Sequence, residues 1–154
     1  KLKFFRLAFG SAGGYGDSIP ADEARQAIEG MFASSGRVKV GWLVSGDMLD
    51  KRAAKVLLNL ALIAGDALVR GGQLDVGIET QGSTVELAVR AQGQKIVLDE
   101  ELRAALSGTL RDEALSSRSA AAWMTRQLVE KAGGEMMLSP PGEPALVFGA
   151  ALPA

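Results

Sequence analysis

The stretch from Ala53 to Glu79, AAKVLLNLALIAGDALVRGGQLDVGIE, constrains the fold more than any other part of the chain. Nearly all of its first half is Val, Leu, Ile or Ala. If the residues are placed on a helix at about 100° per residue, the polar ones gather on one narrow stripe. That stripe consists of Arg52, Lys55, Asn59, Asp66 and Arg70. The pattern predicts a long helix that is buried on most sides. Gly71-Gly72 is expected to end it, and the alternation of apolar residues from Leu74 predicts a half-buried strand.

The composition excludes several classes of function. The chain has 154 residues, 47% hydrophobic and 23% charged, which suits one globular domain with its own core. Its net charge is -1 without a basic cluster, so a nucleic-acid surface is not expected. It contains neither Cys nor His, so it offers no thiolate metal site and no phosphohistidine. No apolar run approaches the ~20 residues of a membrane span.

Hydrophobic periodicity in the rest of the chain predicts an α+β fold. We expect a two-layer sandwich in which a mixed five-stranded sheet carries three main helices on one face. The strands are expected near Val38–Val44, Leu74–Glu79, Val85–Ala91, Glu135–Ser139 and Ala145–Leu152. The second and third of these should form an antiparallel hairpin. The remaining helices are expected to start at a capping Ser18 and to cover Asp99–Leu106 and Ser119–Ala132.

The start of the chain has a different character from the rest. Residues 1–10, KLKFFRLAFG, read as the last turns of a helix, and the density of apolar side chains requires a covering partner. That partner is either missing upstream chain or a second copy. Residues 11–17 form a Gly-rich linker without the Gly-Lys-Ser/Thr of a P-loop, and residues 18–154 form the main domain. Because the first residue is Lys1, we expect this start to be the interior of a larger protein.

The order of elements resembles the GHKL (Bergerat-type) ATP-binding domain of sensor histidine kinases. That family's long helix carries Asn-Leu-Leu-x-Asn-Ala, and the matching Asn59–Ala64 reads NLALIA. Asn59 keeps the first Asn, whereas Ile63 replaces the second, which in the family helps hold Mg²⁺ and the phosphates. The family's next box, Val-x-Asp-x-Gly-x-Gly-Ile, matches Val89–Ile96, VRAQGQKI. Here Ala91 replaces the adenine-binding Asp, Gly93 is kept, and Lys95 replaces the second Gly.

A third box of the family, Gly-Leu-Gly-Leu at the start of the last helix, matches Ala120-Ala121-Ala122-Trp123. Trp123 is bulky where the backbone must approach phosphate closely. The resemblance therefore implies a degenerate nucleotide site that binds no ATP, no metal and no other cofactor. Trp123 either caps the core where nucleotide would have been or contacts a partner. Asn59 is a relic, a buried structural amide or a ligand contact.

Within that group, KFFRLAFGSAG at Lys3–Gly13 resembles the junction of ChpT-type histidine phosphotransferases. The resemblance implies that residues 1–10 end a helical hairpin that dimerises and carries the phosphoacceptor His outside this chain. No catalytic residue can then be assigned here. Phe4, Phe5, Arg6 and Phe9 are expected at the dimer or partner interface. Asp66 and Arg70, four residues apart, are expected to form a solvated ion pair.

The same resemblance implies a cytoplasmic protein of a two-component phosphorelay. It would pass phosphoryl between a hybrid histidine kinase and response-regulator receiver domains, and residues 18–154 would dock the receiver, whose own Mg²⁺ serves the transfer. Two alternatives remain open from the sequence. One is an ATP-dependent sensor histidine kinase core, and the other is a non-catalytic dimeric adaptor.

Overall fold

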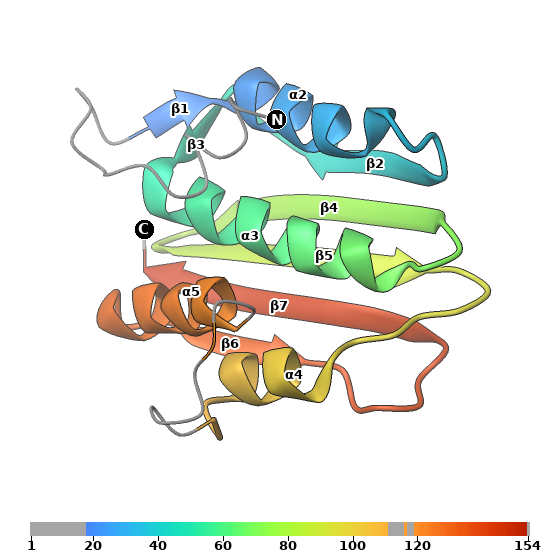
Figure 1. The fold of residues 1–154 in the computed structure, drawn as a ribbon. Helices are drawn as coiled ribbons and strands as arrows, with labels where there is room; N and C mark the ends of the chain where they lie inside the picture. Colours follow the sequence, from blue (N-terminus) through green and yellow to red (C-terminus); the bar gives the residue numbers. More distant parts are fainter. Residues whose placement is uncertain (1–17, 111–115, 117–118, 154) are drawn as a thin grey trace.

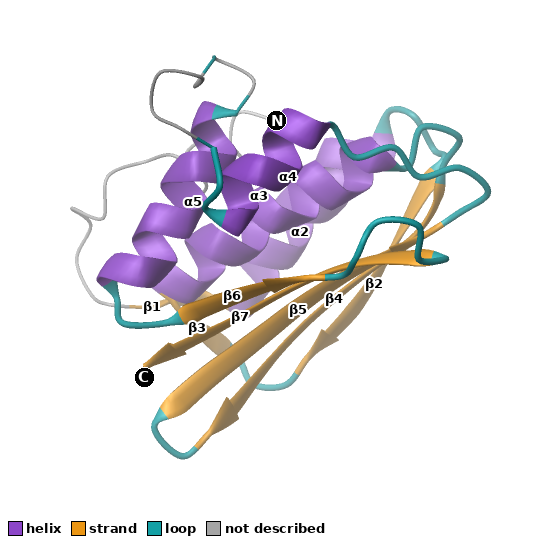
Figure 2. Ribbon diagram, turned by 90° about the horizontal axis from the view of Figure 1, so that it is seen from below, coloured by secondary structure: helices purple, strands orange, loops and turns teal. Residues whose placement is uncertain are grey.

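The computed structural model describes residues 18–110, 116 and 119–153. The interface residues expected near the start, Phe4, Phe5, Arg6 and Phe9, lie outside the described residues. The described chain is a two-layer sandwich in which a twisted sheet is covered on one face by helices and bare on the other (Figures 1 and 2). The α+β class, the mixed sheet and the placement of the helices on one face are therefore confirmed.

Helices and strands are mixed along the chain, which ends in the β6–β7 hairpin. In order they are β1 Ser18–Pro20, α2 Ala21–Ala33, β2 Val38–Val44, β3 Met48–Asp50, α3 Lys51–Ala67, β4 Gly72–Gln81, β5 Thr84–Gln92, α4 Glu100–Ser107, α5 Ala120–Lys131, β6 Glu135–Leu138 and β7 Ala145–Pro153. The five-stranded sheet has the order β2-β4-β5-β7-β6. β2 and β4 are parallel, whereas the other three pairings are antiparallel. The five predicted strands all form, each within two residues of the expected bounds.

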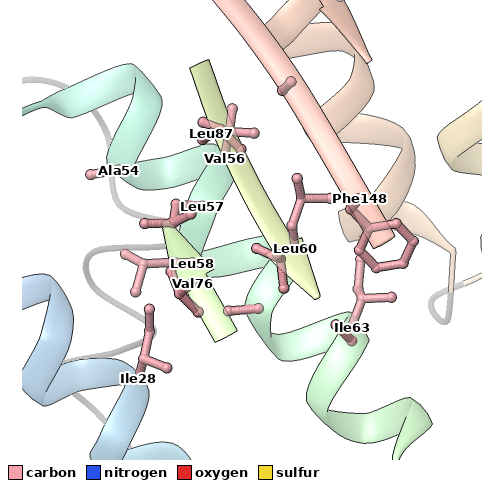
Figure 3. Close-up of a cluster of buried hydrophobic side chains, with 14 of the residues drawn as sticks. Ile28, Ala54, Val56, Leu57, Leu58, Leu60, Ile63, Val76, Leu87 and Phe148 are labelled. Atoms are coloured by element: carbon pink, nitrogen blue, oxygen red, sulfur yellow. The ribbon is translucent and has the colours of Figure 1, made fainter. Parts of the chain in front are cut away.

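Helix α3 lies at the centre of the helical layer. Asp50 caps it: its Oδ1 accepts the backbone N–H groups of Arg52 and Ala53 at 2.9 and 3.0 Å. Twelve of its 17 residues are buried, and they pack against the sheet, α2 and α5. Figure 3 shows this core, where Leu57 and Leu60 of α3 meet strand residues such as Val76 and Phe148. Each fully buried Leu or Val contributes about 1.5–3 kcal/mol, so this helix anchors the domain.

The predicted end of the long helix was wrong by a few residues. The helix ends at Ala67, and the N–H of Leu68 donates to the Gly65 carbonyl at 3.1 Å. Arg70 therefore follows the helix and does not share a helical face with Asp66, so the predicted i,i+4 pair is not formed. Gly71 and Gly72 instead make the entry to β4, with φ of 80° and 146°. They are needed there because the backbone of Arg37 comes close to Gly71 and that of Gln92 comes close to Gly72.

The predicted role of Ser18 as a helix cap was also wrong. Ser18–Pro20 is extended and pairs antiparallel with β3, placing Ile19 opposite Leu49. Helix α2 begins one residue after Pro20, whose φ of -60° and ψ of 133° belong to extended chain, and no side chain caps it. The pairing with β3 explains the difference, because it engages this segment before the helix can start. Strand β3 was not predicted from the sequence.

A substitution at Gly72 tests whether the close backbone packing at the entry to β4 requires glycine. An added Cβ at Gly72 would lie 2.1 Å from the Gln92 carbonyl oxygen, whereas one at Gly30, inside α2, would meet nothing within 4 Å. We expect Gly72→Ala to lower the free energy of unfolding by about 2 kcal/mol or more, since both φ and space oppose the methyl group. Gly30→Ala, the matched control, should raise it by roughly 0.5–1 kcal/mol. Urea denaturation gives both values, and equal stability of the two variants would contradict this account.

Candidate functional site: the former nucleotide positions and the groove beside them

The positions that match the kinase nucleotide site are distributed over α3, the end of β5, the loop that follows it and the start of α5. Ile63 is buried and belongs to the same core cluster as Phe148 of β7 (Figure 3). Ala91 has no exposed surface, and it lies on the side of β5 that faces the helices. The residues that replace the metal-binding Asn and the adenine-binding Asp therefore form part of the hydrophobic core.

The loop after β5 closes onto the end of α3. The N–H of Val97 donates to the Ala67 carbonyl at 2.8 Å, and Ile96 forms an isolated antiparallel bridge with Leu68. Gly93 is exposed, yet a Cβ on it would lie 2.5 Å from the carbonyl oxygen of Gly71. The glycine retained from the family box therefore permits close packing of backbone on backbone. Lys95 is exposed on this same loop.

Asn59, the other residue retained from the family pattern, lies one turn before Ile63 on α3. Its side chain is 6% exposed, and its Nδ2 donates to the Lys55 carbonyl of its own helix at 2.8 Å. A buried amide needs such a partner, because leaving it without one costs about 1–3 kcal/mol. This hydrogen bond is that of a buried structural amide, one of the three interpretations of Asn59 that the sequence left open.

Asn59 also borders a groove between α3 and α5 with a volume of about 320 Å³. We call this the α3–α5 groove. Its described lining consists of Lys55, Asn59, Ala121, Trp123, Met124, Thr125, Gln127, Leu128 and Lys131. Trp123 is partly buried and contacts the core from one side, while the Met124 side chain is 60% exposed. Trp123 therefore lies at the boundary between the core and solvent. This position is compatible with both interpretations from the sequence, a cap on the core and a contact with a partner.

The α3–α5 groove is apolar along its wall and basic at one end. Lys55 comes from the first half of α3 and Lys131 is the last residue of α5. Figure 1 shows these two helix ends on the same side of the molecule. No acidic side chain is among the described residues that line the groove. Its chemistry is that of an apolar surface with a cationic margin.

Asp66 lines a second cavity, at the opposite end of α3, together with Arg37, Ser35 and Phe32. Burial raises the pKa of the Asp66 carboxyl above its ordinary value. Within the described part of the chain, no group of three or more acidic residues could hold a metal ion. None of the described helices is long and apolar enough to span a membrane.

The sequence analysis identified one wall of the α3–α5 groove but not the groove itself. The stripe that holds Lys55 and Asn59 was evident from helical periodicity. The other wall is supplied by α5, whose residues Met124, Leu128 and Lys131 follow a helical spacing of three to four. Only the packing of α5 beside α3 joins the two walls, and single-helix patterns carry no information on that packing.

Comparison with known proteins identifies the family. A family model described as the histidine phosphotransferase C-terminal domain matches residues 21–144. The chain belongs to this family. The protein phosphotransferase ChpT of Brucella abortus (strain 2308) is 28% identical over 150 residues, which cover 97% of this chain and 71% of that protein. A solved bacterial phosphotransferase is similar over 97% of this chain and 70% of its own, with 28% identity and a TM-score of 0.82.

Histidine kinases share the fold at lower similarity. The mycobacterial sensor histidine kinase MprB matches 88% of this chain and 95% of its own, with 18% identity and a TM-score of 0.63. The histidine kinase domain of the Erythrobacter litoralis blue-light activated kinase EL346 matches 97% of this chain and 70% of its own, with 13% identity and a TM-score of 0.64. The GHKL-type fold expected from the order of elements is therefore confirmed.

Proposed function

We propose that the intact protein is a histidine phosphotransferase of a two-component phosphorelay. It passes phosphoryl between a hybrid histidine kinase and response-regulator receiver domains in the cytoplasm. The observation that carries this proposal is the union, in one chain, of membership in the phosphotransferase family with buried Ile63 and Ala91 at the metal and adenine positions. A kinase-type scaffold without its nucleotide ligands fits a relay protein better than a kinase.

In this proposal the phosphoryl group is carried by residues outside the 154-residue sequence, because that sequence contains no His. The phosphorus–nitrogen bond to a histidine of an upstream helical hairpin breaks as a phosphorus–oxygen bond forms to the receiver's Asp, and the reverse step loads the histidine. Mg²⁺ held by the receiver neutralises charge during transfer. Residues 18–154 contribute by docking the receiver, which holds the two reacting groups in line.

The first test is phosphotransfer itself. The intact protein, mixed with a phosphorylated receiver domain and no ATP, should become labelled, and it should pass the label on to a second receiver. A variant with the upstream His replaced by Ala should stay unlabelled, because the proposed acceptor is gone. Gel autoradiography follows the label. Labelling of that variant, or of a chain consisting of residues 1–154 alone, would show that the acceptor has been assigned wrongly.

The second test concerns nucleotide. We expect no saturable binding of Mg-ATP or Mg-ADP at millimolar concentration. A dissociation constant of 1 mM already requires about 4 kcal/mol of binding free energy. Ile63 and Ala91 supply neither a metal ligand nor an acceptor for the adenine amine, so little remains to provide it. Titration calorimetry measures this directly, and a saturable heat would favour the alternative of an ATP-dependent sensor kinase core.

The third test concerns assembly. We infer that the intact protein is a homodimer held through the hairpin that residues 1–10 complete, joined by residues 11–17 to the domain at 18–154. Phe4, Phe5 and Phe9 make this segment strongly apolar. Light scattering should give a dimer for the intact protein and a monomer for a chain that starts at Ser18. If both proteins were dimers, the dimer contact would have to lie within the domain at residues 18–154.

A further inference from the structure

The α3–α5 groove has no part in the phosphoryl chemistry proposed above, yet its surface is unusual for a solvated helix pair. Met124 is 60% exposed, and the partly buried Trp123 and Leu128 lie beside it. Trp and Met are enriched at protein interfaces, and an apolar surface bordered by polar residues is typical of a docking site. The groove therefore offers anchors for a partner's apolar side chain.

The two buried polar side chains of the groove, Asn59 and Thr125, already have hydrogen-bond partners. Asn59 donates to the Lys55 carbonyl at 2.8 Å, and Thr125 Oγ1 donates to the Ala121 carbonyl at 2.7 Å. Each hydrogen bond stays within its own helix, so the hydrogen-bonding needs of these two buried side chains are met without a ligand. A site for a polar small molecule instead needs converging donors and acceptors that are free to bind it. The groove suits an apolar side chain of a protein partner.

The basic end of the groove sets the charge of that partner. Lys55 and Lys131 both line it, and neither makes an ion pair within the described chain. The nearest acid on α5, Glu130, is held by Arg126 at 2.6 Å. Two unneutralised cations beside an apolar wall attract a surface that presents carboxylates next to an apolar side chain.

We propose that the α3–α5 groove docks the receiver domain, which inserts an apolar side chain at Met124 and Leu128 and presents carboxylates to Lys55 and Lys131. This rests on the proposed function and assigns its docking surface. A receiver must hold Mg²⁺ at its phosphorylated Asp. Because Mg²⁺ is held through carboxylates, the surface of the receiver around that Asp is acidic. Figure 1 shows the start of α3 and the end of α5 on the same side of the molecule as β1, where the described chain begins. A receiver docked there lies on the side of the domain where the described chain begins.

Variants of the intact protein test this, each with a matched control on the bare face of the sheet. Lys55→Glu reverses one cation of the groove and Lys131→Gln neutralises the other, while the control Lys39→Glu reverses an exposed lysine of β2. Met124→Ala removes the apolar anchor, and Met137→Ala truncates a methionine that is 71% exposed on β6. The phosphotransfer rate is measured against receiver concentration at low and high salt, with thermal melting of every variant as the check on folding.

The Lys55→Glu and Met124→Ala variants should each raise the half-saturating receiver concentration roughly 10-fold, while the rate at saturation stays unchanged. Loss of the cations should also flatten the dependence on salt. The two controls should behave as wild type. Wild-type behaviour of the groove variants, or equal losses in the controls, overturns the proposal. A change in oligomeric mass caused by Met124→Ala also overturns it, because the groove is then a contact between copies.

Failure of the proposed function is distinguishable from failure of this inference. If the wild type transfers phosphoryl to no receiver of its source organism, the relay proposal fails. Fluorescently labelled receivers are then titrated against the intact protein without any transfer. Binding that Lys55→Glu weakens and Lys39→Glu does not would support the docking surface by itself. Absence of binding to every receiver would overturn the docking surface as well.

Discussion

Burial of α3 is the constraint on which the rest of the structure depends. A helix that is apolar around most of its circumference must be covered on both flanks as well as on the side facing the sheet. The sheet supplies one cover, and α2 and α5 supply the others. The contact with α2 is close: a Cβ at Gly65 would lie 2.1 Å from the ring of Phe32. The positions of the neighbouring helices, and hence of the α3–α5 groove, follow from this requirement.

The same constraint explains how the former nucleotide positions contribute to stability. A kinase keeps polar side chains there, and each must find a partner or a ligand when water leaves. Ile63 and Ala91 need no partner and extend the core instead. The loop after β5 then closes onto the end of α3 with backbone hydrogen bonds, as Val97 does with Ala67. Asn59 stays polar because its own helix provides the acceptor.

The sequence predicted what depends on periodicity and could not predict what depends on packing between distant segments. Alternating side chains predicted the strands and the antiparallel β4–β5 hairpin, because these signals are local. Ser18 was misread because its pairing with Asp50 lies 32 residues away along the chain. The end of α3 at Ala67 was missed because apolar periodicity continues to Val69. The α3–α5 groove needs two helices whose relative position no local pattern encodes.

The short β1–β3 ribbon has a mechanical consequence. Ser18, the first described residue, is paired with Asp50, and Asp50 is also the residue that caps α3. The N–H of Ala21 donates to the Asp47 carbonyl at 2.8 Å, which fastens the start of α2 to the same ribbon. A force applied where the chain enters the domain is therefore delivered to the most deeply buried helix. The ribbon, the two helices that begin beside it and the sheet they cover are thus linked into one connected unit.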